Sequence, residues 1–340
     1  MKGVVKYARG VGNVELRDVS EPEADAGQVK IEVKACGVCG TDLHIYHDEY
    51  PSNPPVVLGH ELAGVVVACG AGVSDFAPGD RVTTRTYYVT CGKCQYCRTG
   101  RDNLCYSRLS IGSGVNGGMA KYVVVPERNV FRLPDNVSFL AGALSEPLSC
   151  TVHAVLLTNR PSPGENVLLT GPGAIGLLAL QLVKVSGARA TMIGTPADAL
   201  RLELARRLGA DEVVLTDQVD SLLERHRNGG FDAAIECSGA PGGIETALRL
   251  VRKGGRYTQV GLVGKKVPLD VDQLVYKEIE FSATFAHVWQ AWPLALALVA
   301  SGAVQTEPLV SHRYPLSKWQ EAFEKFASRE GVKIVLEPEE

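Results

Sequence analysis

Residues 165–176 read ENVLLTGPGAIG, a run rich in leucine and valine that leads into Gly171, Gly173 and Gly176. The apolar segment LLALQLVKV follows directly. A strand, a glycine turn and a helix in this order form the context in which the G-x-G-x-x-G pattern binds a dinucleotide, because glycines let the pyrophosphate approach the backbone at the helix N-terminus. The stretch therefore predicts a nucleotide site at these glycines and at Ile175.

A glycine motif alone is weak evidence, and it gains weight here from the alternation of strand-like and helical segments that follows it. We expect strands at residues 190–194, 212–216, 232–238, 256–260 and 279–285, and helices at residues 198–208 and 244–252. Strands and helices that alternate in this way are typical of α/β proteins with a parallel, doubly wound sheet.

The composition is that of a globular protein and excludes several functions. The 340 residues exceed what one hydrophobic core usually supports, so two domains are expected. A hydrophobic share of 45% with 21% charged residues argues against disorder. The net charge of −3 and the lack of a long basic run argue against nucleic acid as a partner. No apolar run approaches the ~20 residues that cross a membrane. We expect a cytoplasmic protein that acts on a small molecule.

Four cysteines lie within fifteen residues, in the stretch CGKCQYCRTGRDNLC at 91–105. Cytosolic thiols are kept reduced, so clustered cysteines there are more often metal ligands than disulfides. The C-x2-C-x2-C-x7-C spacing of Cys91, Cys94, Cys97 and Cys105 lets one short lobe surround a tetrahedral zinc ion. Four thiolates leave no open position, so this zinc should be structural. The alternative is a reduced lobe without metal.

A second possible metal site lies upstream, at Cys39, His60 and Glu61. A single cysteine is usually a small buried apolar residue, and a single His-Glu pair is usually at the surface or a satisfied polar group in the core. Together with the four-cysteine lobe thirty residues further on, the metal interpretation is favoured. A thiolate, an imidazole and a carboxylate suit a zinc site that has room for a substrate.

Taken in order, the motifs GHE, the four-cysteine lobe, SEPLSC and GPGAIG resemble those of the zinc-containing medium-chain alcohol dehydrogenases. Within that family they resemble the sorbitol (polyol) and threonine dehydrogenase branch. The resemblance covers essentially the whole chain. It implies a reversible hydride transfer between a secondary alcohol and NAD(P), with two zinc ions per chain, one catalytic and one structural.

The same resemblance implies a domain division. A GroES-like, β-rich catalytic domain is expected at residues 1–149, with the structural-zinc lobe at 91–105. A Rossmann NAD(P)-binding domain should follow at residues 150–286, and residues 287–340 should return to the catalytic domain. The family also suggests a homo-oligomer, either a dimer or a tetramer.

Carried over residue by residue, Cys39, His60 and Glu61 match the catalytic zinc positions. Glu146, in SEPLSC, stands where many members have a further protein ligand, commonly cysteine. The polyol branch has glutamate at this position, and that glutamate often touches the zinc through water. Glu146 is therefore an expected ligand, bound directly or through water.

Three residues after Cys39 match further catalytic positions of the family. Thr41 and His44 match a proton relay, which would carry the hydroxyl proton from the substrate to solvent. Asp42 matches the carboxylate that orients His60. Without the resemblance, Thr41 and His44 would be interpreted as an exposed turn.

The sequence leaves the choice of nicotinamide open. About twenty residues past the glycine motif, NAD enzymes carry an acid that binds the ribose diol. This chain instead has Gly194, Thr195 and Pro196 there. An uncharged tip with Arg201 nearby could accept the 2′-phosphate of NADP. Alternatively, Thr195 with Asp198 is simply the N-terminal cap of the next helix.

Substrate identity is the least determined property. Tyr46, His47, Tyr50, His287 and Trp289 offer hydrogen-bonding groups, which favours a polyol or sugar alcohol over a simple aliphatic alcohol. Threonine, sugar-phosphate or cyclitol oxidation remain alternatives, and a non-catalytic zinc- and nucleotide-binding protein is a remote one. A zinc-free reductase of the same superfamily is disfavoured because both zinc motifs are present.

Overall fold

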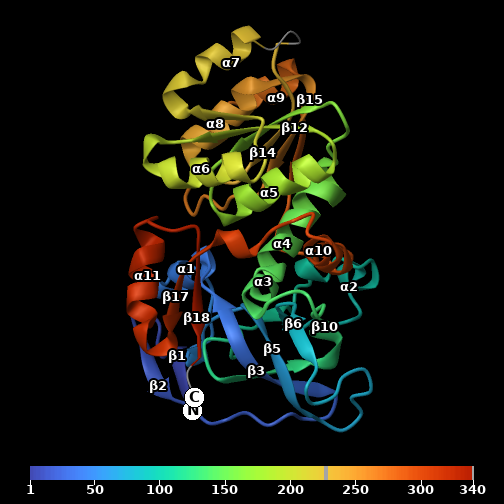
Figure 1. The fold of residues 1–340 in the computed structure, drawn as a ribbon, viewed down its shortest axis with the longest axis vertical. Helices are drawn as coiled ribbons and strands as arrows, with labels where there is room; N and C mark the ends of the chain where they lie inside the picture. Colours follow the sequence, from blue (N-terminus) through green and yellow to red (C-terminus); the bar gives the residue numbers. More distant parts are fainter. Residues whose placement is uncertain (226–228, 339–340) are drawn as a thin grey trace. The chain divides into compact units, whose positions relative to one another are not determined.

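The computed structural model describes residues 1–225 and 229–338. The chain divides into two compact units. The first unit comprises Met1–Pro147, Val288–Ala300 and Thr306–Glu340, and the second comprises Leu148–His287 and Ser301–Gln305. Figure 1 shows the ribbon of both. None of the described helices is long and apolar enough to cross a membrane.

The second unit is built on a six-stranded sheet in the order β13-β12-β11-β14-β15-β16, in which every pair is parallel. Its strands are β11 (Asn166–Thr170), β12 (Arg189–Gly194), β13 (Glu212–Leu215), β14 (Phe231–Glu236), β15 (Val251–Gln259) and β16 (Glu280–Ala283). The chain runs outward from β11 in one direction and then returns to β14 on its other side. The doubly wound α/β fold predicted from the sequence is therefore confirmed. The carboxyl ends of β11 and β14 form the switch point at which such sheets bind ligands.

Helices connect these strands and cover the sheet. They are α5 (Ala174–Val185), α6 (Ala199–Arg207), α7 (Asp220–Arg225), α8 (Pro241–Leu250) and α9 (Val271–Tyr276). The helix expected at residues 244–252 ends earlier, at Leu250, because Val251 already pairs with Phe231 as the first residue of β15. Valine is β-branched and buried here, and both properties favour a strand.

The first unit is dominated by a seven-stranded sheet in the order β10-β6-β5-β3-β18-β17, with β9 also paired to β3. Its strands are β3 (Gln28–Gly37), β5 (Glu61–Cys69), β6 (Arg81–Thr84), β9 (Tyr122–Pro126), β10 (Val130–Arg132), β17 (Val310–Pro315) and β18 (Lys333–Glu337). All pairs are antiparallel except β17 with β18. Its core contains valines and isoleucines at alternate positions, as in Val29, Ile31 and Val33 of β3.

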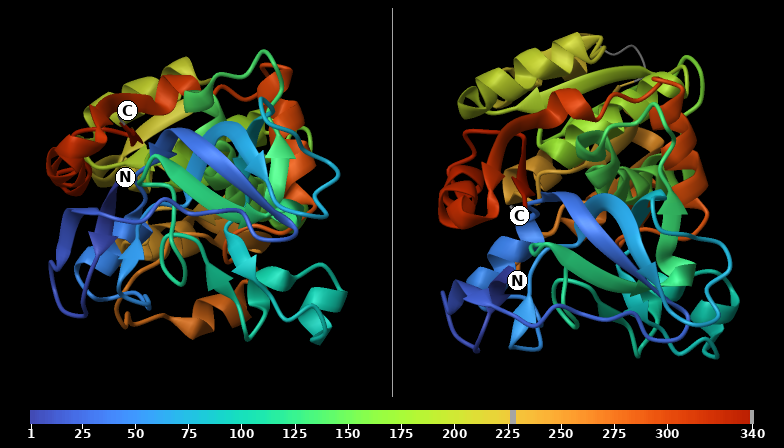
Figure 2. Two further views of the ribbon diagram at one scale, coloured as in Figure 1. Left: turned by 90° about the horizontal axis from the view of Figure 1, so that it is seen from below. Right: turned by 60° about the horizontal axis from the view of Figure 1, so that its bottom comes forward.

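The C-terminal segment returns to this sheet. Strand β18 pairs with β3, with Val335 opposite Gly37 and Leu336 opposite Cys36. The views of Figure 2 show the red C-terminal elements beside the blue N-terminal strands. Helix α11 (Trp319–Ala327) packs Trp319 and Phe323 into the same core. Val288–Ala300 and the chain from Thr306 onward, which includes β18, group with the first unit, whereas Ser301–Gln305 group with the second. Strand β18 borders the site described below.

Candidate active site

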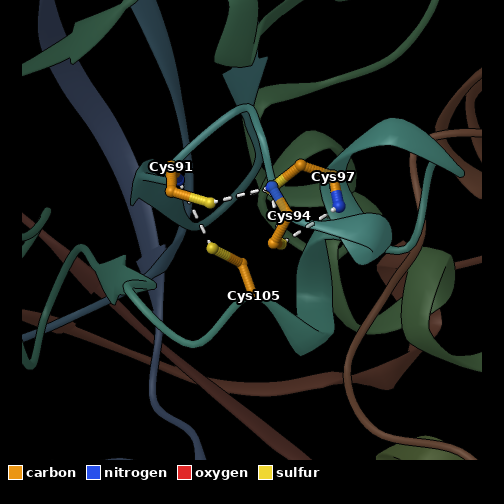
Figure 3. A group of neighbouring side chains, drawn as sticks. All are labelled: Cys91, Cys94, Cys97 and Cys105. Carbon is orange, nitrogen blue, oxygen red and sulfur yellow. Dashed lines mark hydrogen bonds between the residues drawn. The ribbon is translucent and has the colours of Figure 1, made fainter.

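The four-cysteine lobe lies between β7 (Tyr87–Val89) and β8 (Leu109–Ser110) and contains the short helix α2 (Gln95–Arg98). The Sγ atoms of its four cysteines lie within 4.8 Å of one another. The Sγ of Cys97 is 3.9 Å from that of Cys91 and 3.5 Å from that of Cys94. Figure 3 shows the four side chains converging. Four sulfurs at about 2.3 Å from a tetrahedral zinc would be about 3.8 Å apart, so the group has the size of a zinc site.

Backbone amides of the lobe point at these sulfurs. The amide of Cys94 donates to the Sγ of Cys91 at 3.3 Å, and the amide of Cys91 donates to the Sγ of Cys105 at 3.3 Å. Hydrogen bonds donated by the backbone amides of Lys93 and Cys94 lower the pKa of the Cys91 thiol to about 6. None of the nine cysteines forms a disulfide. The amides therefore favour the thiolate form of Cys91, whereas burial raises the pKa of the Cys97 thiol to about 12.

A buried ion pair attaches the lobe to the sheet. Arg85 follows β6 and is 4% exposed. Its guanidinium donates to both carboxylate oxygens of Asp102, at 2.8 and 2.7 Å. Asp102 lies only three residues before Cys105. Both bonds come from the same Nη2 atom, and this charge-assisted contact joins the end of β6 to the segment that carries Cys105.

Strand pairing assembles the second cluster. Gly37, the last residue of β3, pairs with Glu61, the first residue of β5. Cys39 follows as the N-cap residue of α1 (Gly40–Tyr46), and His60 directly precedes β5. As a result, one ligand atom each of Cys39, His60 and Glu61 lies within 4.8 Å of the others.

Asp42 lies on the first turn of α1 and is fully buried. One oxygen accepts a hydrogen bond from the Cys39 amide at 2.8 Å, which closes the start of the helix. The other, Oδ1, is 3.8 Å from Nδ1 of His60 and has no hydrogen-bond partner among the described residues. This distance is longer than a hydrogen bond. The carboxylate nevertheless faces the imidazole, as expected of a group that orients a metal ligand.

The electrostatics of the cluster favour a cation. Burial lowers the pKa of His60, but the Cys39 thiolate, Asp42 and Glu146 outweigh burial and raise the pKa well above its usual value. A thiol and two carboxyl groups around one imidazole favour a positive charge there, and the same groups suit a divalent metal ion. The donor set and this potential both fit zinc.

Glu146 lies in the first turn of α4 (Ser145–Val152) and is 6% exposed. It influences the pKa values of both His60 and Lys333. Among the described residues, however, the group whose ligand atoms lie within 4.8 Å of one another comprises only Cys39, His60 and Glu61. Glu146 is therefore near the cluster and outside its tightest part.

The two predicted relay residues both lie on α1. The Oγ1 of Thr41 is 3.8 Å from the Sγ of Cys39, so its hydroxyl borders the cluster. His44 is one turn further along, and its side chain is 36% exposed. Its Nδ1 is 2.8 Å from Oε2 of Glu49. Glu49 was not expected from the sequence, where it is one of two acids in the segment YHDEY.

Lys333 is a second residue that sequence reasoning missed. Its Nζ donates to both carboxylate oxygens of Glu61, each at 2.7 Å, although the two residues are 272 positions apart. Burial lowers the pKa of Lys333, and the anions Glu61, Cys39 and Glu146 together raise it above its usual value. The only signal in the sequence is a lysine that begins the apolar run KIVL, without any indication of its partner.

The glycine turn of the second unit has the geometry that its motif requires. Gly171 has φ +87°, and a Cβ there would lie 2.7 Å from Ser238. A Cβ on Gly176 would lie 2.0 Å from the carbonyl oxygen of Gly171. Around Gly173, the N-cap residue of α5, the space is open within 4 Å of a Cβ. Two glycines thus permit the turn, and the third leaves room in front of the helix N-terminus, where Ile175 lies in the first turn.

The tip of β12 forms a cap. Asp198 Oδ2 accepts hydrogen bonds from the Thr195 amide at 3.0 Å and from the Thr195 hydroxyl at 2.7 Å. Its other oxygen is 3.5 Å from Nη1 of Arg201. The capping alternative considered for Thr195 is therefore present in the structure, and Asp198 is engaged in local contacts.

Comparisons with known proteins place this arrangement in a family. The model of the alcohol dehydrogenase GroES-like domain matches residues 25–135, and that of the zinc-binding dehydrogenase matches residues 174–301. The D-arabitol-phosphate dehydrogenase of Enterococcus avium is 41% identical, with 100% of this chain and 99% of that protein covered. The sorbitol dehydrogenase of Halalkalibacterium halodurans is 39% identical, with 99% of each covered. A protein from Sinorhizobium meliloti 1021, solved with NADP bound, superposes with a TM-score of 0.91 at 34% identity and 99% coverage of both chains.

The chain belongs to the zinc-binding medium-chain alcohol dehydrogenase family. It is a dehydrogenase of that family, with a GroES-like part and a Rossmann-type part as predicted. The relatives are named enzymes, which favours the enzymatic hypothesis over a non-catalytic binding protein.

Proposed function

We propose that the protein oxidises a secondary alcohol of a polyol or sugar alcohol reversibly to a ketone, with NAD(P) and with a zinc ion at Cys39, His60 and Glu61. The observation that carries this proposal is the convergence of a thiolate, an imidazole and a carboxylate within 4.8 Å of one another. Three protein ligands of this kind leave a coordination position for substrate. Glu146, which lies outside the tightest group, would contact the ion through water.

Zinc held by these residues supplies Lewis acidity that makes the substrate hydroxyl more acidic. NAD(P) supplies the hydride acceptor. The side chains of α1 handle the proton. Thr41, whose hydroxyl borders Cys39 at 3.8 Å, accepts it from the substrate, and His44 passes it to solvent from its partly exposed position. Glu49 fixes the Nδ1 of His44, so the Nε2 is left to accept the proton.

The four-cysteine lobe would hold a second, structural zinc ion. It has four sulfurs at zinc-like separations and amides directed at them, and four thiolates leave no position for substrate. Its role is to stabilise the segment between β7 and β8. The nine free cysteines also support a reducing cytoplasmic location.

The coenzyme would bind at Gly171, Gly173, Ile175 and Gly176, with its pyrophosphate at the N-terminus of α5. The β12 tip favours NADP over NAD. Its Asp198 binds Thr195 and Arg201, so this carboxylate is directed to local contacts rather than to a ribose diol, and Arg201 lies close enough to the tip to meet a 2′-phosphate.

Sugar phosphates are the second candidate substrates, because the relative from Enterococcus avium is named a D-arabitol-phosphate dehydrogenase. The test is a panel of polyols, sugar phosphates, cyclitols and amino alcohols with NAD and with NADP, measured by absorbance of the reduced coenzyme. Turnover of a polyol supports the leading candidate. Turnover restricted to phosphates or to threonine would replace it, and no turnover by a two-zinc preparation would contradict both.

A homo-oligomer also belongs to the proposal. Strand β16 is the last strand of its sheet, and the neighbouring helix α9 exposes Val271 by 56%, Val275 by 65% and Tyr276 by 76%. Among the described residues β16 has no partner strand on its outer side, and this edge and the apolar side chains of α9 would each suit contact with a second copy of the chain. Val275→Glu should shift the mass in light scattering toward the monomer. An unchanged mass would place the interface elsewhere.

A further inference from the structure

We propose that Lys333 is a positioning residue that competes with the catalytic metal for Glu61, and so weakens the hold of the site on its zinc ion. The inference rests on the proposed metal site at Cys39, His60 and Glu61. It concerns a residue outside the ligand set, contributed by β18.

The first support is the set of hydrogen bonds that the ammonium group of Lys333 donates. Its Nζ donates to Oε1 and Oε2 of Glu61, each at 2.7 Å, and to the carbonyl oxygen of Val38 at 3.1 Å. An ammonium group has three donors, and all three are used. Lys333 is therefore left with no donor for a substrate or a coenzyme, which excludes a direct catalytic role. Both oxygens that Glu61 could offer to a metal accept a hydrogen bond from the same cation.

The second support is that this pair is buried. The side chains of Lys333 and Glu61 are 4% and 1% exposed. Little water is available there to replace either partner, so each charge depends on the other or on a metal ion. When zinc is absent, Lys333 neutralises Glu61. When zinc binds, Glu61 gains a second cationic neighbour and has to loosen its contact with the first.

The third support is steric and explains why the carboxylate cannot turn away. A Cβ on Gly37 would lie 2.1 Å from Oε2 of Glu61. The carboxylate therefore rests against the backbone of β3, in space that exists only because residue 37 is glycine. Its oxygens also lie beside the ammonium of Lys333 and near the ligand atoms of Cys39 and His60.

The position of Lys333 is set by the sheet. Val335 pairs with Gly37 and Leu336 with Cys36, which places Lys333 within hydrogen-bond distance of the Val38 carbonyl. The register fixes the backbone of Lys333, and the bond to the Val38 carbonyl holds its ammonium beside Glu61. Removing its charge should therefore leave Glu61 to the metal alone. We expect tighter zinc binding, since the negative charge of Glu61 would no longer be partly neutralised by a lysine.

The experiment measures zinc release to a chromogenic chelator from the zinc-loaded protein. The wild type should release zinc in two phases, and Cys39→Ser, which keeps the four-cysteine lobe, should lose the phase of the catalytic site. Lys333→Met should slow that phase by about tenfold or more, because removing a cation beside the site removes repulsion of ~1.4 kcal/mol or more. Lys333→Arg, which keeps the charge, should stay close to wild type.

Two further variants make the result decisive. Lys333→Gln keeps a hydrogen-bond donor without the charge and should also slow release, so it carries the test if Lys333→Met does not fold. Lys30 is another buried lysine. It lies on β3 and its Nζ is 2.6 Å from a carboxylate oxygen of Glu21, so Lys30→Met should leave both phases of zinc release unchanged. If Lys333→Met or Lys333→Gln releases the catalytic zinc as fast as wild type or faster, the inference is wrong and Lys333 is a structural partner of Glu61. If Cys39→Ser retains the full zinc content, the proposed metal site itself is wrong.

Discussion

Gly37 and Glu61 lie opposite each other on β3 and β5, and a single methyl group on Gly37 would come within 2.1 Å of a Glu61 carboxylate oxygen. The site therefore depends on a glycine for space, since Gly37 has no need of a left-handed backbone conformation. Gly37, which has no side chain, thus controls where the carboxylate of Glu61 can lie.

Gly37→Ala should displace Glu61 and lower the zinc content at the catalytic site. Overpacking of this kind costs roughly 1 to 3 kcal/mol, so the free energy of unfolding should fall by a similar amount. Gly40→Ala is the matched control, because a Cβ there meets no atom within 4 Å. Zinc analysis and denaturant unfolding check both variants. Equal zinc content and stability in the two would show that Glu61 adapts without cost.

Cys94→Ser should lower both zinc content and thermal stability, because one of four sulfurs that hold the lobe together is lost. The loss of stability should clearly exceed the ~1 kcal/mol of an average substitution. Cys69→Ser is the control, since Cys69 is a half-buried free cysteine outside both clusters. An unchanged melting temperature and zinc content for Cys94→Ser would contradict a structural zinc.

Cys39→Ser and His60→Ala should abolish turnover, while the fold and coenzyme binding are retained. The physical reason is that both residues belong to the proposed catalytic cluster in the first unit, whereas the glycine turn belongs to the second. Steady-state assays, coenzyme titration and circular dichroism separate these effects. Wild-type turnover by either variant would show that the cluster is not the catalytic site.

Thr195→Asp should shift the ratio of kcat/KM values toward NAD by roughly tenfold, about 1.4 kcal/mol, because a new carboxylate repels the 2′-phosphate and can bind the ribose diol. The structure adds a second expectation. Asp198 already accepts a hydrogen bond from the Thr195 hydroxyl at 2.7 Å, so a second acid there should also lower stability slightly.

Thr195→Ser keeps the hydroxyl and is the control for that experiment. Arg201→Ala should weaken NADP more than NAD, since a charge-assisted hydrogen bond is worth on the order of 1.5 to 3 kcal/mol. If Thr195→Asp changes the NAD to NADP ratio by less than about twofold, this tip does not read the 2′ position and acts only as a helix cap.

Local patterns predicted the parts of the protein that are made locally. The turn at Gly171 and the four-cysteine lobe each lie within a few residues of sequence, so spacing alone restricts their geometry. The residue at which α8 ends could not be predicted from the local sequence. Val251 leaves the helix because it pairs with Phe231 across the sheet, and a pairing twenty residues away has no local signature.

The sequence by itself thus determined the α/β class, the glycine turn and the identity of both groups of candidate metal ligands, because residue type and short spacing specify donor chemistry. Only the tertiary structure decided how those ligands are held. Lys333 reaches Glu61 across 272 residues because β18 pairs with β3 in one register, and no property of the segment around Lys333 selects that register. In the same way, the need for glycine at position 37 arises from Glu61 on the strand that pairs with it.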